Sequence, residues 1–396
     1  MNFINTNVVY KIFHLKYLNL ISSIKICLCM KITKKSFLLI QLALLGCYMP
    51  GIAQKNDYKS EVIDLSININ KHFYIDSLNY YKETSIAEKE GRKVAYLWPL
   101  CALFEAYNEM EKVVPKTVLT AKIFQIIEKY HNQFLPAPGY ASYPMQYGGG
   151  TRFYDDNQWL GITAMDAYAN TKNDNWLTVG KDIYKFMMTG YDTVAGGGLY
   201  WEEGNKKSKN TCSNGPGIIL ALQLYKATKN RTYLDTALLL YNWVNTNLQS
   251  AAGLYYDNLN LTKKIVDKRL YSYNTGTMLQ SAVYLYECTD DKKYLHQAIS
   301  IADSSVKYFL GNKIFKDDYW FSAVLLRGYQ HLLQHNKDEK YIIAFKACLD
   351  EALANNKNAN GLMGNSKPLN LVAQGGMLEI LARFSWLQQN SFFINQ

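Results

Sequence analysis

Thr171-Lys-Asn-Asp-Asn-Trp-Leu177 is a polar turn that ends in an aromatic and an aliphatic residue, and it recurs along the chain. The pattern returns at Thr228-Lys-Asn-Arg-Thr-Tyr-Leu234 and Thr289-Asp-Asp-Lys-Lys-Tyr-Leu295, with a weaker copy at Asn336-Lys-Asp-Glu-Lys-Tyr-Ile342. An amphipathic segment of helical period follows each copy. Regular recurrence of one turn indicates a fold built from similar units, so each copy is expected to join two helices.

Two kinds of helical pattern alternate between these turns. Patterns that are apolar on nearly all sides start near Val94, Trp159, Gly217, Thr277, Phe321 and Leu371. Amphipathic patterns with lysine-rich faces occupy 58–75, 117–131, 175–188, 232–248, 292–309 and 339–354. A helix that is apolar all round is buried, whereas a helix with one apolar stripe lies at the surface. The alternation therefore predicts an all-α fold, an (α/α)6 barrel with six inner and six outer helices.

A second repeat precedes several of the inner helices. Small residues, two aromatics and a carboxylate follow one another in Gly148-Gly-Gly-Thr-Arg-Phe-Tyr-Asp155, Gly196-Gly-Gly-Leu-Tyr-Trp-Glu202 and Ala252-Gly-Leu-Tyr-Tyr-Asp257. All three lie on connections from an outer to an inner helix, so they should gather at one rim of the barrel. Aromatic faces, carboxylates and amides at one rim suit a neutral sugar, because rings stack on pyranose C–H groups while polar groups bind hydroxyls.

Asp155 and Asp156 are the candidate catalytic residues. Neighbouring buried carboxylates repel each other, so one tends to keep its proton while the other stays ionised, and an acid and a base can cleave a glycosidic bond. Adjacent residues fit the closer carboxyl spacing, about 5–5.5 Å, that accompanies retention of configuration. The alternative is that Asp155, Asp156 and Asn157 are a solvated N-cap of the following helix.

The N-terminal segment resembles an export signal. Residues 1–53 contain six lysines and no acid, and without them 37 basic face 33 acidic residues, a net charge of +4 instead of +10. No basic cluster remains, so no nucleic-acid partner is expected. A basic region at 31–35 and an apolar region at 37–46 precede Ala53, an expected cleavage point. Residues 1–29 would be an upstream extension from a mis-chosen start codon.

The leader leaves two outcomes open. Leu44-Leu-Gly-Cys47 resembles a lipobox, so Cys47 would carry a lipid anchor, whereas cleavage after Ala53 would release the protein. Both predict an exported protein in the periplasm, at the cell surface or secreted, and any membrane contact would be through that anchor. Residues 54–396 are expected to form one catalytic domain that acts as a monomer.

No cofactor or metal is predicted. The chain has no phosphate-binding loop, dinucleotide fingerprint or Cys-x-x-Cys pair. None of the five histidines outside the leader is expected to form a metal-binding pair. The four cysteines of the mature part, Cys101, Cys212, Cys288 and Cys348, are expected to be small buried apolar residues.

The mature sequence resembles glycoside hydrolase family 76, the endo-α-1,6-mannanases. Four blocks carry the resemblance over residues 58–386: Tyr154-Asp-Asp-Asn-Gln-Trp159, Tyr96-Leu-Trp-Pro-Leu-Cys101, Lys209-Asn-Thr-Cys-Ser-Asn-Gly-Pro216 and Tyr271-Ser-Tyr-Asn-Thr-Gly276. The resemblance implies an (α/α)6 barrel that retains configuration on α-mannan, with Asp155 as nucleophile and Asp156 as general acid/base. Leu199-Tyr-Trp201 and Thr275 depart from the family pattern, where a Trp-rich segment and glutamine are common.

Eight further residues are expected to bind substrate. They are Trp98, Asn157, Tyr200, Trp201, Asn214, Asp257, Tyr273 and Asn274.

Two other functions remain open. A non-catalytic surface glycan-binding protein could use the same barrel, since fold does not fix function, but it would not need both aspartates. A related lyase or unsaturated-uronyl hydrolase predicts basic residues in the cleft, and the rim motifs offer mainly Arg152 and Lys209.

Overall fold

Helices arranged in two layers make up most of the computed structural model, which describes residues 57–86, 92–365 and 368–392. The inner helices are α4 (Leu97–Val113), α6 (Tyr154–Thr171), α8 (Thr211–Thr228), α10 (Ser272–Thr289), α12 (Tyr319–Asn336) and α14 (Leu371–Gln389). The outer helices are α3 (Tyr58–Phe73), α5 (Leu119–Ile127), α7 (Asp174–Met188), α9 (Arg231–Leu248), α11 (Lys292–Phe309) and α13 (Lys340–Asn356). The leader with Cys47 lies outside the described residues.

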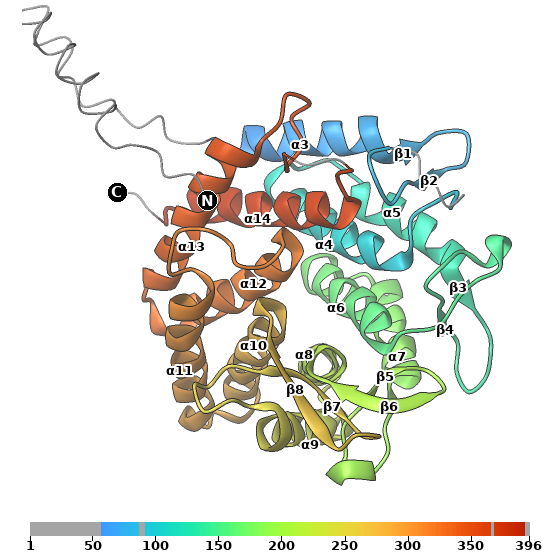
Figure 1. Ribbon diagram of the computed structural model, residues 1–396, viewed down its shortest axis with the longest axis vertical. Helices are drawn as coiled ribbons and strands as arrows, with labels where there is room; N and C mark the ends of the chain where they lie inside the picture. Colours follow the sequence, from blue (N-terminus) through green and yellow to red (C-terminus); the bar gives the residue numbers. More distant parts are fainter. Residues whose placement is uncertain (1–56, 87–91, 366–367, 393–396) are drawn as a thin grey trace, which may run out of the picture. The chain divides into compact units, whose positions relative to one another are not determined.

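The inner helices form a closed ring, as Figure 1 shows. Each packs against the next in chain order, and α14 packs against α4 to close the circle. Each outer helix packs against an inner neighbour: α3 on α14, α5 on α4, α7 on α6, α9 on α8, α11 on α10 and α13 on α12. The predicted (α/α)6 barrel is confirmed.

The burial of each layer follows its sequence pattern. In α8 every residue from Thr211 to Leu224 is buried. In α11 the buried residues fall on one stripe that includes Ala298, Ile301 and Ser305, spaced by three or four positions. This is the helical period of an amphipathic surface helix, so the apolar content of each segment decides its layer.

The repeated turn connects four inner helices, α6, α8, α10 and α12, to the outer helix that follows each of them. At the end of α6, Lys172 is left-handed with a φ of 57°, which stops the helix. Asn173 then caps α7 by accepting a hydrogen bond from the amide of Asn175. The hydroxyl of Thr171 joins both parts, because it donates to the carbonyl of Ala167 and accepts from the amide of Asn173. The left-handed residue recurs as Lys229, Asp290 and Lys337.

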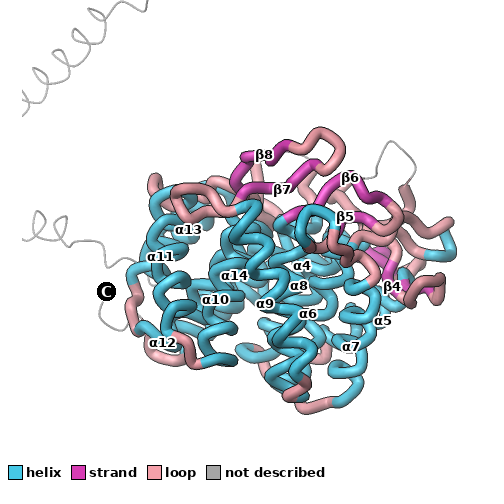
Figure 2. The backbone as a smooth tube through the Cα atoms, turned by 90° about the horizontal axis from the view of Figure 1, so that it is seen from below, coloured by secondary structure: helices cyan, strands magenta, loops and turns pink. Residues whose placement is uncertain are grey.

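The opposite end of the barrel carries strands, which the sequence patterns did not predict. Figure 2 shows them at one end of the helices, away from the short turns. A four-stranded antiparallel sheet contains β5 (Tyr200–Glu202), β6 (Asn205–Asn210), β7 (Tyr256–Asn260) and β8 (Ile265–Leu270) in that order. Two further pairs are β1 (Tyr74–Ile75) with β2 (Tyr80–Tyr81), and β3 (His131–Asn132) with β4 (Gly139–Tyr140). The long outer-to-inner connections therefore gather at one rim, as predicted.

Most inner helices do not begin where their apolar patterns begin, although α14 does begin at the predicted Leu371. α6 starts at Tyr154, ahead of the predicted Trp159, and α8 and α10 are offset in the same direction. α4 starts at Leu97, after the predicted Val94. The early turns of α6 and α8 are polar and lie outside the apolar patterns, yet they are helical and their side chains lie at the rim.

A buried ion network crosses the interior between α4, α12 and α14. Arg327 donates two hydrogen bonds of 2.7 Å to the two carboxylate oxygens of Glu379. Arg383 also contacts Glu379 at 2.7 Å and reaches Glu105 at 2.8 Å. Buried charges need such partners, because an unpaired one is costly to remove from water.

Two further findings concern the rest of the described chain. Cys101, Cys212 and Cys348 are buried and Cys288 is partly buried, and all four are free thiols. No helix among the described residues has the length and apolar character needed to cross a membrane.

Candidate functional site

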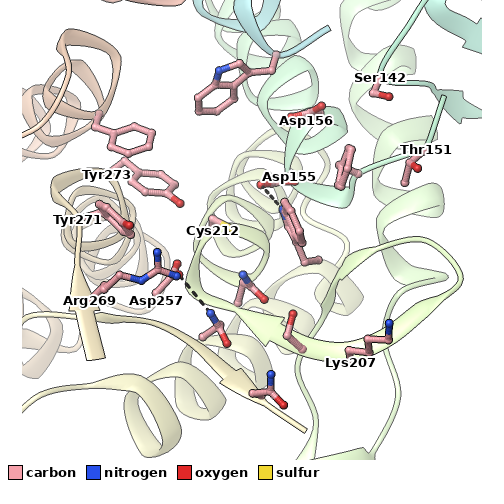
Figure 3. Close-up of a pocket in the computed structure, with 18 of the residues that line it drawn as sticks. Ser142, Thr151, Asp155, Asp156, Lys207, Cys212, Asp257, Arg269, Tyr271 and Tyr273 are labelled. Carbon is pink, nitrogen blue, oxygen red and sulfur yellow. Dashed lines mark hydrogen bonds and ion pairs between the residues drawn. The ribbon is translucent and has the colours of Figure 1, made fainter. Parts of the chain in front are cut away.

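A cavity of about 850 Å³ opens at the rim where the strands lie. Its walls come from the inner-helix starts and from the connections before them. It brings together six of the predicted site residues: Trp98, Asp155, Asp156, Trp201, Asp257 and Tyr273. Figure 3 shows Asp155 and Asp156 on one side of this space and Arg269, Tyr271 and Tyr273 on the other.

Asp155 and Asp156 lie in the first turn of α6 and both face the cavity. The N-cap of this helix is Phe153, and no side chain caps it. The two aspartates are only 8% and 7% exposed. The alternative interpretation, a solvated N-cap, is therefore wrong. Two carboxylates held together with little water have the environment that separates an acid from a base.

Burial raises the pKa of both carboxyl groups, by different amounts. Burial raises the pKa of Asp155 to about 6, although hydrogen bonds from Cys212 and Trp201 offset part of the effect. The pKa of Asp156 rises well above its ordinary range because of burial, the charge of Asp155 and, more weakly, Glu83. Of the two carboxyl groups, Asp156 is thus the one that holds its proton more tightly.

Aromatic side chains form much of the cavity wall. Tyr273 stacks on Phe321 with ring centroids 4.0 Å apart. Trp201 is 39% exposed, packs against Phe153 and donates from Nε1 to Oδ2 of Asp155 at 3.1 Å. Trp201 therefore offers a ring face to a ligand while its N–H holds the carboxylate in place.

Asp257 and Arg269 form a polar pair on the sheet that borders the cavity. Arg269 on β8 donates to Oδ2 of Asp257 on β7 at 3.1 Å, and Asn258 donates to the same oxygen at 3.2 Å. Burial raises the pKa of Asp257, while Arg269, Asn258 and the buried Asn274 lower it. A carboxylate and a guanidinium at one wall can accept from and donate to neighbouring hydroxyl groups of a sugar.

Asn157 and Asn214 were predicted to bind substrate, but they do not line the cavity. The side chain of Asn157 accepts from the amide of Tyr140 and donates to its carbonyl. Asn214 holds the amide and carbonyl of Leu199 in the same manner. Both asparagines occupy the same position of their helices, and each binds the backbone of the connection that precedes its helix. They therefore hold the rim in shape without facing the cavity.

Tyr200 and Asn274 also lie behind the cavity surface. The hydroxyl of Tyr200 donates to Asp192 at 2.7 Å, and its ring lies under the buried ammonium of Lys209. Asn274 is fully buried. The aromatic and amide types pointed correctly to this rim, but both side chains are buried and absent from the cavity wall.

Basic residues at the cavity are not the ones that the motifs suggested. Arg152 pairs with Glu203, and Lys209 is buried against Asp192. Arg269 and Lys207 line the cavity instead. They lie on β6 and β8, whose polar sequences carry no motif that points to the cavity.

Comparisons with known proteins agree with this geometry. The family model "Glycosyl hydrolase family 76" matches residues 68–359. Mannan endo-1,6-alpha-mannosidase DCW1 of Candida albicans is 29% identical over 171 residues, which cover 39% of this chain and 38% of that protein. Its namesake in Saccharomyces cerevisiae is 30% identical over 172 residues, 39% of this chain and 38% of that protein. The chain thus spans about two fifths of these curated relatives.

Solved structures resemble the whole barrel. The mannosidase Bt3792 of Bacteroides thetaiotaomicron is 25% identical, with a TM-score of 0.77 over 85% of this chain and 100% of its own. An α-1,6-mannanase from Salegentibacter sp. shares the fold at 20% identity, with a TM-score of 0.72 over 83% of this chain and 99% of its own.

Proposed function

The chain belongs to glycosyl hydrolase family 76, and from this premise we propose that it is an exported enzyme that cleaves α-1,6-mannosidic bonds in mannan. Residues 54–396 would be the catalytic domain, released or anchored at the cell envelope after removal of the leader. The substrate follows from the names of the relatives, which are mannan endo-1,6-alpha-mannosidases and α-1,6-mannanases.

The observation that carries this proposal is the pair of adjacent buried carboxylates with unequal pKa values in an aromatic cavity. Asp156 donates its proton to the glycosidic oxygen while Oδ1 or Oδ2 of Asp155 attacks the anomeric carbon. The bond to the leaving sugar breaks and a covalent mannosyl-enzyme forms. The N–H of Trp201 favours the ionised form of Asp155 before the attack.

The second step returns both carboxyl groups to their starting states. Asp156, now ionised, takes a proton from a water molecule that attacks the anomeric carbon. The ester bond to Asp155 breaks, and the product keeps the α configuration because two inversions have occurred. An inactive variant of the Salegentibacter mannanase, in which two adjacent aspartates are replaced by asparagine, was solved with α-1,6-mannotriose.

Sugar binding would use both kinds of wall. Tyr273 and Phe321 offer stacked rings on the cavity wall, with centroids 4.0 Å apart. Trp98 offers a further ring, held by the buried Trp320 at a centroid distance of 4.4 Å. Asp257 and Arg269 would bind hydroxyls of a second ring across the cavity. No cofactor is needed, since two carboxylates supply the proton and the nucleophile.

The first experiment is digestion of linear α-1,6-mannan with the purified protein, with products followed by chromatography over time. Short mannooligosaccharides that appear early would support endo cleavage. Retarded migration of the protein in a mannan-containing gel without any product would support the glycan-binding alternative and contradict the proposed activity.

A second experiment tests the stereochemistry. NMR of the first products should show the α anomer before mutarotation. A β anomer as first product would exclude the covalent intermediate on Asp155 and would require an inverting mechanism.

A further inference from the structure

Glu287, His331 and His335 gather at the end of the barrel opposite the catalytic cavity. Glu287 lies near the end of α10, and both histidines lie near the end of α12. Phe321, at the start of α12, lines the cavity. At a helical rise of about 1.5 Å per residue, His335 lies about 21 Å further along the helix. The cluster is therefore separate from the proposed catalytic site.

Two ring nitrogens and one carboxylate oxygen of this cluster lie close together. Oε1 of Glu287 lies 2.9 Å from Nε2 of His331 and 2.8 Å from Nε2 of His335. The three side chains place one candidate ligand atom each within 4.8 Å of the others. The prediction that no histidine pair has metal-binding spacing is wrong, because residues four apart lie on one face of a helix. Glu287, which comes from another helix, could not be linked to them by spacing.

The ligand types match a transition-metal ion. Two imidazoles and one carboxylate with a fourth open position are a set that Zn²⁺ accepts. In a tetrahedral zinc site with bonds of about 2.0–2.1 Å, neighbouring ligand atoms lie about 3.3 Å apart. The two carboxylate–imidazole separations of 2.8 and 2.9 Å would have to widen by about half an ångström, and the two imidazole nitrogens already lie within 4.8 Å of each other.

The surroundings leave room for a fourth ligand and a route for the ion. Glu287 and His331 line a polar cavity of about 340 Å³, which can hold a water molecule. Glu287 and His335 are partly exposed. Lys226 donates to Oε2 of Glu287 at 2.6 Å, and its side chain is 44% exposed. The lysine can therefore remain on Oε2 or withdraw into solvent when an ion binds Oε1.

The hydrogen bonds of the cluster do not account for one buried nitrogen atom of His331. His331 is 9% exposed, and its Nδ1 is buried without a hydrogen-bond partner in the described part of the chain. Its ring is held by an edge contact with Tyr284, with centroids 4.3 Å apart, and by Glu287. Buried polar atoms without partners are uncommon and often mark a place that an ion or ordered water completes.

We propose that Glu287, His331 and His335 form a binding site for a divalent transition-metal ion, Zn²⁺ above all, that ties α10 to α12. Such an ion would join two neighbouring inner helices far from the cleft, at the end where only short turns connect the layers. Metal binding of this kind stabilises the folded state, because the unfolded chain does not present the same ligands together.

The test is titration of ZnCl₂ into the full protein, without a polyhistidine tag and after treatment with EDTA, followed by isothermal titration calorimetry. We expect one saturable site per chain. His335→Gln should weaken Zn²⁺ binding by more than about tenfold. Loss of a group that only supports a metal ligand already weakens binding by about tenfold, and His335 would itself be a ligand. His296→Gln, which removes an exposed histidine on α11, is the matched control and should bind as the wild type does.

A second variant and a second readout keep the test decisive if one variant does not fold. If the buried His331→Gln variant does not fold, Glu287→Gln and His335→Gln, at partly exposed positions, carry the comparison. Co²⁺ in place of Zn²⁺ should give visible absorption bands of a tetrahedral site in wild type and in His296→Gln, but not in His335→Gln. Absence of saturable Zn²⁺ binding, or equal affinity in His335→Gln and His296→Gln, would overturn the proposal.

Discussion

Asp155 and Asp166 lie near opposite ends of α6, and burial raises the pKa of each to about 6. Their neighbours differ. Asp166 accepts a hydrogen bond from Gln223 and lies in a polar cavity with Lys112 and Arg383. Asp155 lies beside Asp156 in the aromatic cavity at the rim. A raised pKa therefore reports burial at both ends, while the second carboxyl and the ring-lined space distinguish the catalytic candidate.

The largest effect is expected at the rim, from Asp156→Ala. Loss of the general acid/base should lower turnover on mannan by about 10³-fold or more. On an aryl α-1,6-mannobioside, whose aryl leaving group needs no proton, added azide should restore the second step and give a mannobiosyl azide of α configuration. Mass spectrometry and NMR of the product would detect it. A β azide would assign Asp156 the nucleophilic role instead.

Away from the rim, the expected loss is one of stability. Glu379→Gln removes the charge that faces both Arg327 and Arg383. Breaking a buried ion pair on one side typically costs about 3–5 kcal/mol. Urea denaturation should show a loss of this size, while the turnover of the folded fraction should stay near that of wild type. A large loss of turnover in the folded fraction would show that this interior network also supports the catalytic rim.

The pH dependence should reflect the rim carboxyls. Activity requires ionised Asp155 and protonated Asp156, so kcat/KM should fall about tenfold per unit below pH 6. It should fall again on the alkaline side, where Asp156 loses its proton. Because the folded state binds the Asp155 proton more tightly, that group stabilises the fold below about pH 4 and loses this contribution as the pH rises through 6. Asp155→Asn should remove that part of the stability profile, and an unchanged profile would contradict this assignment.

The smallest effect is expected in the repeated turns. Asp291 caps α11 by accepting from the amide of Lys293 at 3.0 Å. Asp291→Ala should cost about 1 kcal/mol, as is usual for an N-cap. Calorimetric unfolding measures the loss, and kcat and KM on mannan should not change. A change in KM would show that this cap, at the turn end of the barrel, affects substrate binding in the cavity.

The difference between the ends also explains what could be predicted from the sequence. Thr171, Lys172 and Asn173 form the turn with local hydrogen bonds only. Because such local patterns repeat in the sequence, the alternation of inner and outer helices could be predicted from them. The catalytic candidates were found for a related reason, since Asp155 and Asp156 are adjacent.

The rest of the rim depends on contacts between distant segments. Asn157 and Asn214 have the residue type of sugar ligands, but their amides clamp the backbone of Tyr140 and Leu199. Thr275 stands at the equivalent position of α10 and accepts one bond, 3.4 Å long, from Tyr255. This departure from the family pattern thus concerns a clamp behind the rim. Residue type alone cannot separate a group that faces a cavity from one that holds its wall.

The most direct test of the account compares the two ends of α6 in one assay. Asp155→Asn and Asp166→Asn make the same chemical change at two carboxylates on one helix. Both variants should be checked for folding by circular dichroism and then incubated with linear α-1,6-mannan. We expect that folded Asp155→Asn releases almost no oligosaccharide, whereas folded Asp166→Asn keeps a turnover close to that of wild type. Near-native turnover of Asp155→Asn, or an equal loss in both variants, would contradict it.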